Sequence, residues 1–222
     1  MSLPLSVHKT GDGSTTLYHE ALNETYHSVH GAVTESRHVF IRNGIEYACE
    51  KFDNAVLNIL EVGFGTGLNA ALTFSFSAER QRQISYFTIE KFPLSPHIYS
   101  QLEFPGVDFP SLIRLHELPW NQLLRMNPGF EFEKREGDVL EEKFPLAHFH
   151  VIYFDAFAPA KQPELWTTGL FEKLFASLTA DGILVTYCAK GQFKRDLKQS
   201  GFLVESLPGP PGKREMVRAV RI

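Results

Sequence analysis

The chain has 222 residues and a formal net charge of −4 at pH 7, which suits one α/β domain with an N-terminal extension. Because the net charge is negative, the protein as a whole does not attract nucleic acid electrostatically, and a polyanion would have to bind a local cationic patch. Two widely separated cysteines predict neither a disulfide nor a metal site. Because no signal peptide opens the chain and no apolar run approaches the roughly 20 residues of a membrane span, we expect a cytoplasmic protein without membrane contact.

The first 50 residues predict a small N-terminal cap. Residues 1–15 are rich in turn-forming residues and predict an N-terminal segment that is frayed or forms a hairpin. Residues 15–20 have alternating polarity and predict a short strand. Residues 24–41 are dense in polar side chains and predict a loop followed by a helix from about Ala32 to Ile41. Seven polar or aromatic residues of this stretch could line a cleft, and a solvated surface cap is an equally good interpretation: Tyr26, His27, Ser28, His30, Glu35, Ser36 and His38.

The rest of the chain is organised around residues 58–69, Asn-Ile-Leu-Glu-Val-Gly-Phe-Gly-Thr-Gly-Leu-Asn, which predict a strand, a tight turn and a helix start. Gly63, Gly65 and Gly67 permit positive φ, and their backbone N–H groups can approach a ligand at the helix N-terminus. A dinucleotide-binding fingerprint requires a glycine at the position that Leu68 occupies. A Walker-type phosphate loop requires a Lys-Ser/Thr pair after the glycines, and none follows here. Both of these readings are therefore disfavoured.

What remains is the pattern Glu61-x-Gly63-x-Gly65-x-Gly67. It resembles the first motif of the class I S-adenosylmethionine-dependent methyltransferases, in which this loop holds the amino-acid end of the cofactor. The resemblance implies S-adenosylmethionine binding by Glu61 and the three glycines, and by Asn69 in the helix that follows. A turn that serves packing alone is the alternative.

Two acids further along extend this site. Residues 84–90 alternate as a second strand, and in doubly wound folds an acid at that strand's end accepts both ribose hydroxyls, so we assign Glu90 this contact. Residues 93–127 predict helices broken by prolines, with Trp120 in the core. Residues 130–138 predict a third strand, and Asp138 at its end is where class I methyltransferases commonly hold the adenine amino group. The alternatives are a solvated strand end for Glu90 and a turn former for Asp138.

A fourth strand, residues 150–155, is continuously apolar and predicts a central strand buried on both faces. Ligands in open α/β sheets bind beyond the carboxyl ends of the strands, so Asp155 should reach the same crevice as the glycine loop. A helix from Pro163 to about Leu178, strands over 181–188, 201–207 and 215–222, and a helix over 189–199 complete the pattern. We expect a Rossmann-like class I methyltransferase fold with a seven-stranded, mostly parallel sheet, an antiparallel last strand and helices on both faces, over residues 51–222, after a cap over 1–50.

Six motifs together resemble the methyltransferase half of the bacterial tRNA-modifying enzyme MnmC. They are Tyr26-His-Ser-x-x-Gly-Ala, Glu35-Ser-x-His-Val-Phe, Leu60-Glu-Val-Gly-Phe-Gly-Thr-Gly-Leu-Asn69, Asp155-Ala-Phe-Ala-Pro-x-Lys-x-Pro-x-x-Trp166, Thr186-Tyr-Cys-Ala-Lys-Gly191 and Gly209-Pro-Pro-Gly-Lys-Arg-Glu-Met216. The resemblance implies methylation of the aminomethyl nitrogen of 5-aminomethyl-2-thiouridine at the tRNA wobble position. The chain ends at the expected seventh strand, so it resembles a stand-alone form without the FAD-dependent oxidase half.

This chemistry suggests roles for further residues. An amine must lose a proton before it accepts a methyl group, and Asp155 is the candidate to orient it and take that proton. Phe157 is a candidate to pack on the sulfonium or the uracil, and Tyr26 or Trp166 to stack the base, with core packing as the alternative for each ring. Four cationic side chains are further substrate-binding candidates: Lys161, Lys190, Lys213 and Arg214. We expect Lys213 and Arg214 to contact phosphates.

Three other functions stay open. An aminopropyltransferase of the spermidine-synthase type shares the fold and an acid after the fourth strand, but uses decarboxylated cofactor and a free polyamine. A methyltransferase acting on a small-molecule amine is a second alternative. A non-enzymatic S-adenosylmethionine-binding scaffold is the third.

Overall fold

The apolar runs of the sequence form the central strands of one large sheet. The computed structural model describes residues 5–53 and 56–222, and within them the sheet has the order β10-β11-β9-β8-β4-β5-β7-β6. The parallel strands β4, β5, β7, β8 and β9 form its middle, and β11 runs antiparallel between β9 and β10. The strand bounds are β4 Leu57–Val62, β5 Ile84–Glu90, β6 Leu123–Asn127, β7 Phe130–Glu136, β8 Phe149–Phe154, β9 Leu178–Thr186, β10 Leu203–Pro208 and β11 Glu215–Val220.

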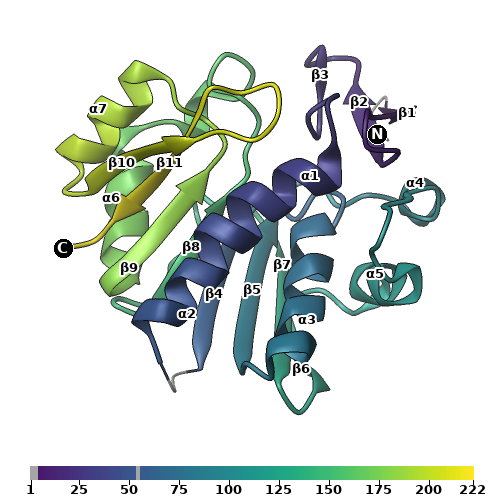
Figure 1. Cartoon of the computed structure of the whole chain (residues 1–222), viewed down its shortest axis with the longest axis horizontal. Helices are drawn as coiled ribbons and strands as arrows, with labels where there is room; N and C mark the ends of the chain where they lie inside the picture. Colours follow the sequence, from purple (N-terminus) through teal and green to yellow (C-terminus); the bar gives the residue numbers. More distant parts are fainter. Residues whose placement is uncertain (1–4, 54–55) are drawn as a thin grey trace.

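Alternation along the strands gives the sheet two buried faces (Figure 1). Ile59 and Tyr153 belong to the core beneath the helices that precede and follow β4, whereas Leu60 and Phe154 belong to the core beneath α6 and α7. The predicted Rossmann-like fold is therefore confirmed. The helices are α1 Ala32–Ser36, the π-helix η1 Arg37–Glu46, α2 Tyr47–Lys51, α3 Leu68–Arg80, α4 Pro96–Tyr99, α5 Phe109–Glu117, the short 3₁₀ helix η2 Pro163–Leu165, α6 Thr168–Ser177 and α7 Gly191–Gln199.

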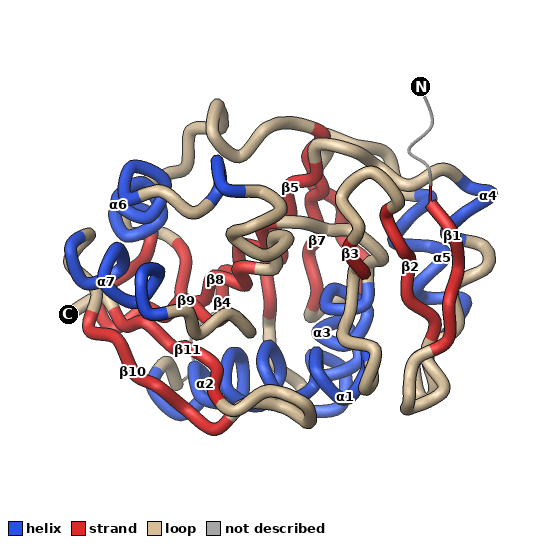
Figure 2. Tube along the Cα trace, turned by 90° about the horizontal axis from the view of Figure 1, so that it is seen from above, coloured by secondary structure: helices blue, strands red, loops and turns tan. Residues whose placement is uncertain are grey.

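The N-terminal residues form a separate small sheet. Strand β1 (Leu5–Lys9) pairs with β2 (Thr15–His19) as a hairpin, and β3 (Glu24–Thr25) pairs with β2, so the predicted hairpin and short strand are confirmed. Residues 1–4 of the predicted lead lie outside the described part of the chain. Figures 1 and 2 show this sheet over the carboxyl ends of β5 and β7, where it borders the crevice of the large sheet.

The helical segment before β4 is longer than the sequence predicted. It runs unbroken from Ala32 to Lys51, past the predicted end at Ile41, and its middle ten residues are π-helical. Gly44 does not end the helix; it allows close packing on the sheet, because a Cβ there would lie 3.1 Å from the Tyr153 ring and 3.2 Å from Val185. The segment packs into the same core as the sheet, and the division at residue 50 stays a prediction.

Two further predictions were wrong in detail. The helical prediction over 93–127 fails after Glu117, because Pro119 follows the helix end and residues 123–127 turn back as β6 against β7. This antiparallel edge strand raises the number of strands in the large sheet to eight in the described residues. The predicted helix from Pro163 to Leu178 is interrupted at Trp166, and Thr167 then caps α6 by accepting a hydrogen bond from the Leu170 N–H at 3.4 Å.

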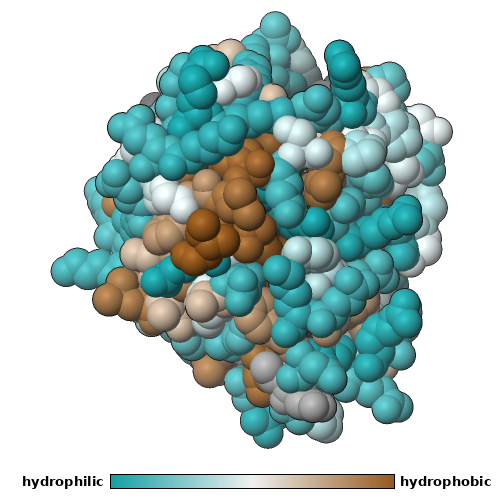
Figure 3. Space-filling model, turned by 60° about the vertical axis from the view of Figure 1, so that its left-hand side comes forward, coloured by the Kyte–Doolittle hydropathy of each residue, from teal (hydrophilic) through white to brown (hydrophobic). Residues whose placement is uncertain are grey.

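The opposite edge of the sheet is β10. Figure 3 brings this side forward and shows an apolar patch surrounded by hydrophilic residues. The side chain of Leu203 on β10 is 51% exposed. Several apolar side chains elsewhere on the surface are exposed to a similar degree. In the described residues no helix has both the length and the apolar character that crossing a membrane requires.

Candidate active site

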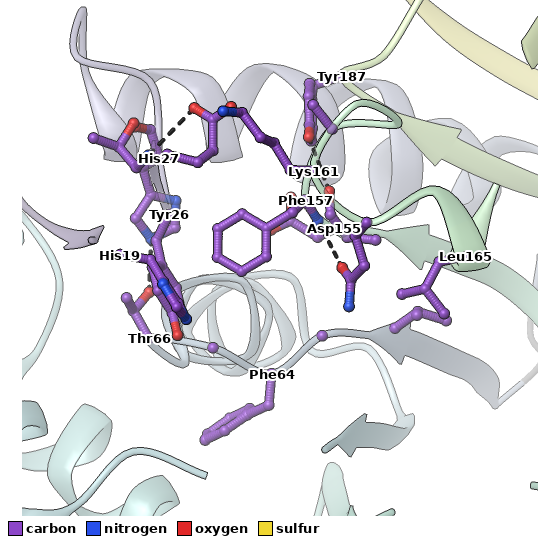
Figure 4. A pocket seen from close by; sticks show the side chains of 18 of the residues that line it. His19, Tyr26, His27, Phe64, Thr66, Asp155, Phe157, Lys161, Leu165 and Tyr187 are labelled. Carbon is purple, nitrogen blue, oxygen red and sulfur yellow. Dashed lines mark hydrogen bonds between the residues drawn. The ribbon is translucent and has the colours of Figure 1, made fainter. Parts of the chain in front are cut away.

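A cavity of about 780 Å³ opens at the carboxyl ends of β4, β5, β7 and β8. Its floor is the loop between β4 and α3, and its walls come from segments far apart in the sequence: residues 19–35, 89–92, 137–139, 155–165, Tyr187 and the loop at 212–213. Parallel strands carry their following loops to the same edge, which explains why these segments converge. Figure 4 shows the side chains around this cavity.

The glycine loop has the backbone that the sequence predicted. Gly63, Gly65 and Gly67 all have positive φ, at 92°, 49° and 74°. A Cβ on Gly63 would stand 3.0 Å from the carbonyl oxygen of Asp155, and one on Gly65 would stand 3.3 Å from the ring of Tyr26. Each position therefore needs glycine for both conformation and space. Gly63 and Gly65 line the cavity, whereas Gly67 is the N-cap of α3 behind it.

Two neutral histidines fix this loop through Thr66. His27 Nε2 lies 2.7 Å from Thr66 Oγ1, and His116 Nε2 donates to the Thr66 carbonyl oxygen at 2.9 Å. Burial lowers the pKa of each imidazole to about 4, so both are uncharged at neutral pH. The structure thus places His27 in the cavity wall as a support of the loop. Ser28 lines the cavity beside it.

Glu61 lies beneath the loop and is not among the residues that line the cavity. It is fully buried, and neither carboxylate oxygen has a partner with hydrogen-bond geometry. Desolvation raises its pKa to about 8, although the nearby Thr88, Asn69 and Tyr86 side chains act in the opposite direction. Glu61 is therefore mostly protonated at neutral pH, and any effect on a ligand passes through the loop above it.

Asn69 and Asp155 form the contact between the first two loops of the site. Asn69 Nδ2 donates to Asp155 Oδ2 at 2.8 Å, and the Asp155 N–H donates to the Val62 carbonyl oxygen at 3.1 Å. Desolvation and the nearby Glu35 carboxylate raise the pKa of Asp155 to about 7, against the opposing effects of Asn69 and Lys213. Asp155 is thus balanced between its two protonation states near neutral pH, as a proton acceptor requires. Asn69, predicted to bind cofactor, lines the cavity and orients this carboxylate.

The two predicted nucleoside contacts also line the cavity. Glu90 accepts the N–H groups of Gly65 at 3.0 Å and Phe92 at 2.8 Å, and burial raises its pKa. Asp138 accepts from Lys91 Nζ at 2.8 Å and from the Leu140 N–H at 2.9 Å. Partial burial acts to raise the pKa of Asp138, but these two donors outweigh it and the pKa is lowered. Each carboxylate keeps further lone pairs for a ligand.

Aromatic rings form the wall next to Asp155 (Figure 4). The rings of Tyr26 and Phe157 meet edge to face with centroids 5.0 Å apart, and both line the cavity. Trp166, the other predicted stacking residue, does not line it. Its ring is buried against Phe154 and Phe193, and its Nε1 donates to the Phe157 carbonyl oxygen at 2.8 Å. Of the two interpretations, the structure favours core packing for Trp166, which in turn supports Phe157.

The predicted cations divide into two groups. Lys161 and Lys213 line the cavity, whereas Lys190 and Arg214 are exposed and lie outside its lining. Lys213 is not a free cation on the surface loop, because its ammonium pairs with the buried carboxylate of Glu35. The sequence prediction also missed Tyr187, Thr66 and His116. Thr66 and Tyr187 stand inside two of the quoted motifs, but nothing in those motifs distinguished them, and His116 lies in none of the motifs.

Comparison with known proteins agrees with this geometry. Residues 136–222 match a family model described as S-adenosyl-L-methionine-dependent methyltransferase. The bifunctional MnmC protein of tRNA 5-methylaminomethyl-2-thiouridine biosynthesis from Pseudomonas aeruginosa is 33% identical over 215 residues, and that from Ectopseudomonas mendocina is 35% identical over 211. These alignments cover 89% and 87% of this chain and 32% of each relative, so the chain spans about a third of their length.

Solved structures extend the comparison. The crystal structure of MnmC2 from Aquifex aeolicus has 27% identity and a TM-score of 0.79, covering 99% of this chain and 71% of that one. The chain resembles the MnmC proteins. The resemblance to MnmC inferred from the motifs is therefore confirmed. Spermidine synthase from Thermotoga maritima, at 12% identity and a TM-score of 0.57 over 98% of this chain and 72% of that one, shows the fold alone.

The lining residues fit S-adenosylmethionine, the cofactor of the matching family. Its amino-acid end is zwitterionic and suits the backbone donors of Gly63 and Gly65, where no Cβ restricts approach. Its ribose diol and adenine amino group are donors that suit Glu90 and Asp138. When bound, the cofactor supplies a methyl group activated by a sulfonium.

Replacing Gly65 tests the loop directly. Gly65→Val should abolish S-adenosylmethionine binding in calorimetry, because a branched side chain would meet Tyr26 and disfavour the positive φ. Gly106→Val is the matched control, since Gly106 also has positive φ (72°) but no atom within 4 Å of its Cβ position. Both variants should lose about 1–2 kcal/mol of stability from backbone strain. Retained binding in Gly65→Val would contradict the assignment.

Glu61 should make folding stability depend on pH. The pKa of Glu61 is about 8 in the folded protein and 4.5 ordinarily, so the folded state binds this proton more tightly than the unfolded state. The resulting stabilisation of the folded state is complete below pH 4.5 and is lost as the pH rises to 8. Glu61→Gln removes this loss. In urea unfolding, the free energy of unfolding of the variant relative to that of the parent should therefore increase by on the order of a few kcal/mol between pH 5 and pH 8. A difference that does not change with pH would mean that Glu61 is ionised in the folded state.

Proposed function

We propose that the chain is an S-adenosylmethionine-dependent methyltransferase that methylates the aminomethyl nitrogen of 5-aminomethyl-2-thiouridine at the tRNA wobble position. The position of Asp155 supports this most strongly. Its carboxylate is held by Asn69 beside the glycine loop, in a cavity walled by Tyr26 and Phe157. The MnmC relatives carry the name of the same modification, 5-methylaminomethyl-2-thiouridine biosynthesis.

The reaction needs alignment and one proton transfer. The amine nitrogen forms a bond to the methyl carbon as the carbon–sulfur bond breaks, and the electron pair of that bond stays on sulfur. Before this, the ammonium form of the acceptor must give up a proton. With a pKa of about 7, Asp155 can accept that proton near neutral pH and pass it to solvent. The carboxylate also accepts a hydrogen bond from the amine and so orients its lone pair.

The acceptor is a base that must leave its stack to reach the cavity. Single-stranded RNA bases are held by stacking on aromatic side chains, and we assign this role to the rings of Tyr26 and Phe157. Among the predicted substrate-binding residues, four polar side chains also line the cavity: His27, Ser28, Lys161 and Lys213. We assign tRNA phosphate contacts to the exposed Lys190 and Arg214, and we place the enzyme in the cytoplasm with its tRNA substrate.

An aminopropyltransferase remains the alternative with the same fold. It would consume putrescine and decarboxylated S-adenosylmethionine. Product analysis with both substrate pairs separates the two reactions, because only one pair should be converted.

Asp155→Asn separates chemistry from binding. The amide keeps the size of the side chain but cannot accept a proton, so the single-turnover rate should fall by roughly 10²-fold or more while the dissociation constant for S-adenosylmethionine changes little. The parent rate should rise with pH through about 7, where the carboxylate ionises. The variant should lack that inflection and recover in part at higher pH, because more of the amine is then neutral. Parental rates at every pH would refute the role of Asp155.

Removing the exposed cations tests tRNA contact. Lys190→Ala with Arg214→Ala should raise the apparent KM for tRNA and flatten its dependence on salt concentration, while cofactor binding is unaffected. The control is Lys51→Ala with Arg80→Ala, which removes two charges at the other end of the sheet (Figure 1). Equal effects of the two double variants would show that only net charge matters.

A further inference from the structure

An ion pair is built into the cavity wall where the two ends of the chain meet. Lys213 Nζ contacts Glu35 Oε1, and both residues line the cavity. The side chain of Glu35 is 9% exposed and that of Lys213 is 31% exposed, so the pair is largely removed from solvent. A surface ion pair contributes little, but a pair held in a cavity exerts a strong local field.

Contacts on both sides fix the pair in place. Glu35 Oε2 accepts the Ser28 N–H at 3.0 Å, and the Lys213 ammonium lies 3.8 Å from the centroid of the Tyr187 ring. The Tyr187 hydroxyl in turn donates to the carbonyl oxygen of Ala156 at 2.8 Å. The cation is therefore held over a ring that is itself anchored next to Asp155.

Both charges act on Asp155. Glu35 raises the pKa of Asp155 and Lys213 lowers it, beside the larger effect of burial. The other titratable groups coupled to this carboxylate lie on β4, on β5 and after β9; they are Glu61, Tyr86 and Tyr187. Glu61 is mostly protonated, and burial raises the pKa of both tyrosines, so these three are neutral at pH 7. Among the described residues, Glu35 and Lys213 are then the charged side chains that shift the pKa of Asp155.

We propose that the Glu35–Lys213 pair is a positioning device of the acceptor site that sets the pH at which Asp155 can take a proton from the substrate amine. The inference rests on the proposed function. Lys213 favours the carboxylate form of Asp155, and its positive charge also disfavours the ammonium form of an amine bound nearby. Glu35 holds the lysine over Tyr187 and limits its effect. This role replaces the phosphate contact predicted for Lys213, because a lysine with a buried counter-ion is not a free phosphate ligand.

Two substitutions should move the pH profile in opposite directions. Lys213→Met removes the cation from the wall, so the apparent pKa of the single-turnover rate should rise by about half a unit or more. Glu35→Gln leaves the cation without its counter-charge and should lower that apparent pKa by a similar amount. The double variant should lie between the two. Lys198→Met is the matched control: it removes an exposed cation of α7 that lies outside the cavity lining, and it should leave the apparent pKa unchanged.

A titration without substrate makes the result independent of the proposed reaction. Carbon-13 NMR of the Asp155 carboxyl in the protein alone should show the same opposite shifts in Lys213→Met and Glu35→Gln. Thermal unfolding checks that each variant is folded. If folded variants move neither the carboxyl titration nor the profile, or move both in one direction, the inference is wrong. If the shifts occur but the parent methylates no tRNA, the proposed function fails and the electrostatic role stands.

Discussion

The close approach of two neighbouring loops is the constraint on which the site depends. Strands β4 and β8 are adjacent and parallel, so the glycine loop after one meets the Asp155 loop after the other. Gly63 permits this approach, because a Cβ would stand 3.0 Å from the Asp155 carbonyl oxygen, and Asn69 then donates to the Asp155 carboxylate. The loop proposed to hold the cofactor is in this way placed beside the carboxylate proposed as the proton acceptor.

Other parts of the chain fix this arrangement from outside the sheet. His27, from the N-terminal segment, and His116, from α5, both bind Thr66, and Glu90 accepts the Gly65 N–H. Glu35 and Lys213 join the two ends of the chain across the cavity wall. Because these contacts are separated by long stretches of sequence, the site is complete only when the whole chain has folded. Burial then shifts the pKa of Asp155 toward neutrality, which connects the packing of the fold to its proposed chemistry.

The sequence predicted those features that depend on local pattern. The glycine spacing indicated positive φ, and the positions of Glu90 and Asp155 at strand ends indicated their place in the crevice. The family resemblance indicated Asp138, and all three acids line the cavity. Strand β6 was missed because prolines and leucines suggested broken helices, and its pairing with β7 is a tertiary effect. The roles of Trp166 and Lys213 could not be predicted, since a ring or a cation in a motif does not show which way its side chain turns. Glu35 was among the residues predicted to line a cleft, and it does line the cavity, but its pairing with Lys213 follows only from the fold.

In the proposed reaction, this cavity brings a methyl donor to an amine on tRNA. The most direct measurement is mass spectrometry of nucleosides from tRNA that lacks the final methyl group, before and after incubation with the protein and S-adenosylmethionine. We expect the protein to convert 5-aminomethyl-2-thiouridine into 5-methylaminomethyl-2-thiouridine, and we expect the Asp155→Asn variant to convert far less in the same time. Unchanged nucleosides after incubation with folded, cofactor-bound protein would contradict the proposed methylation.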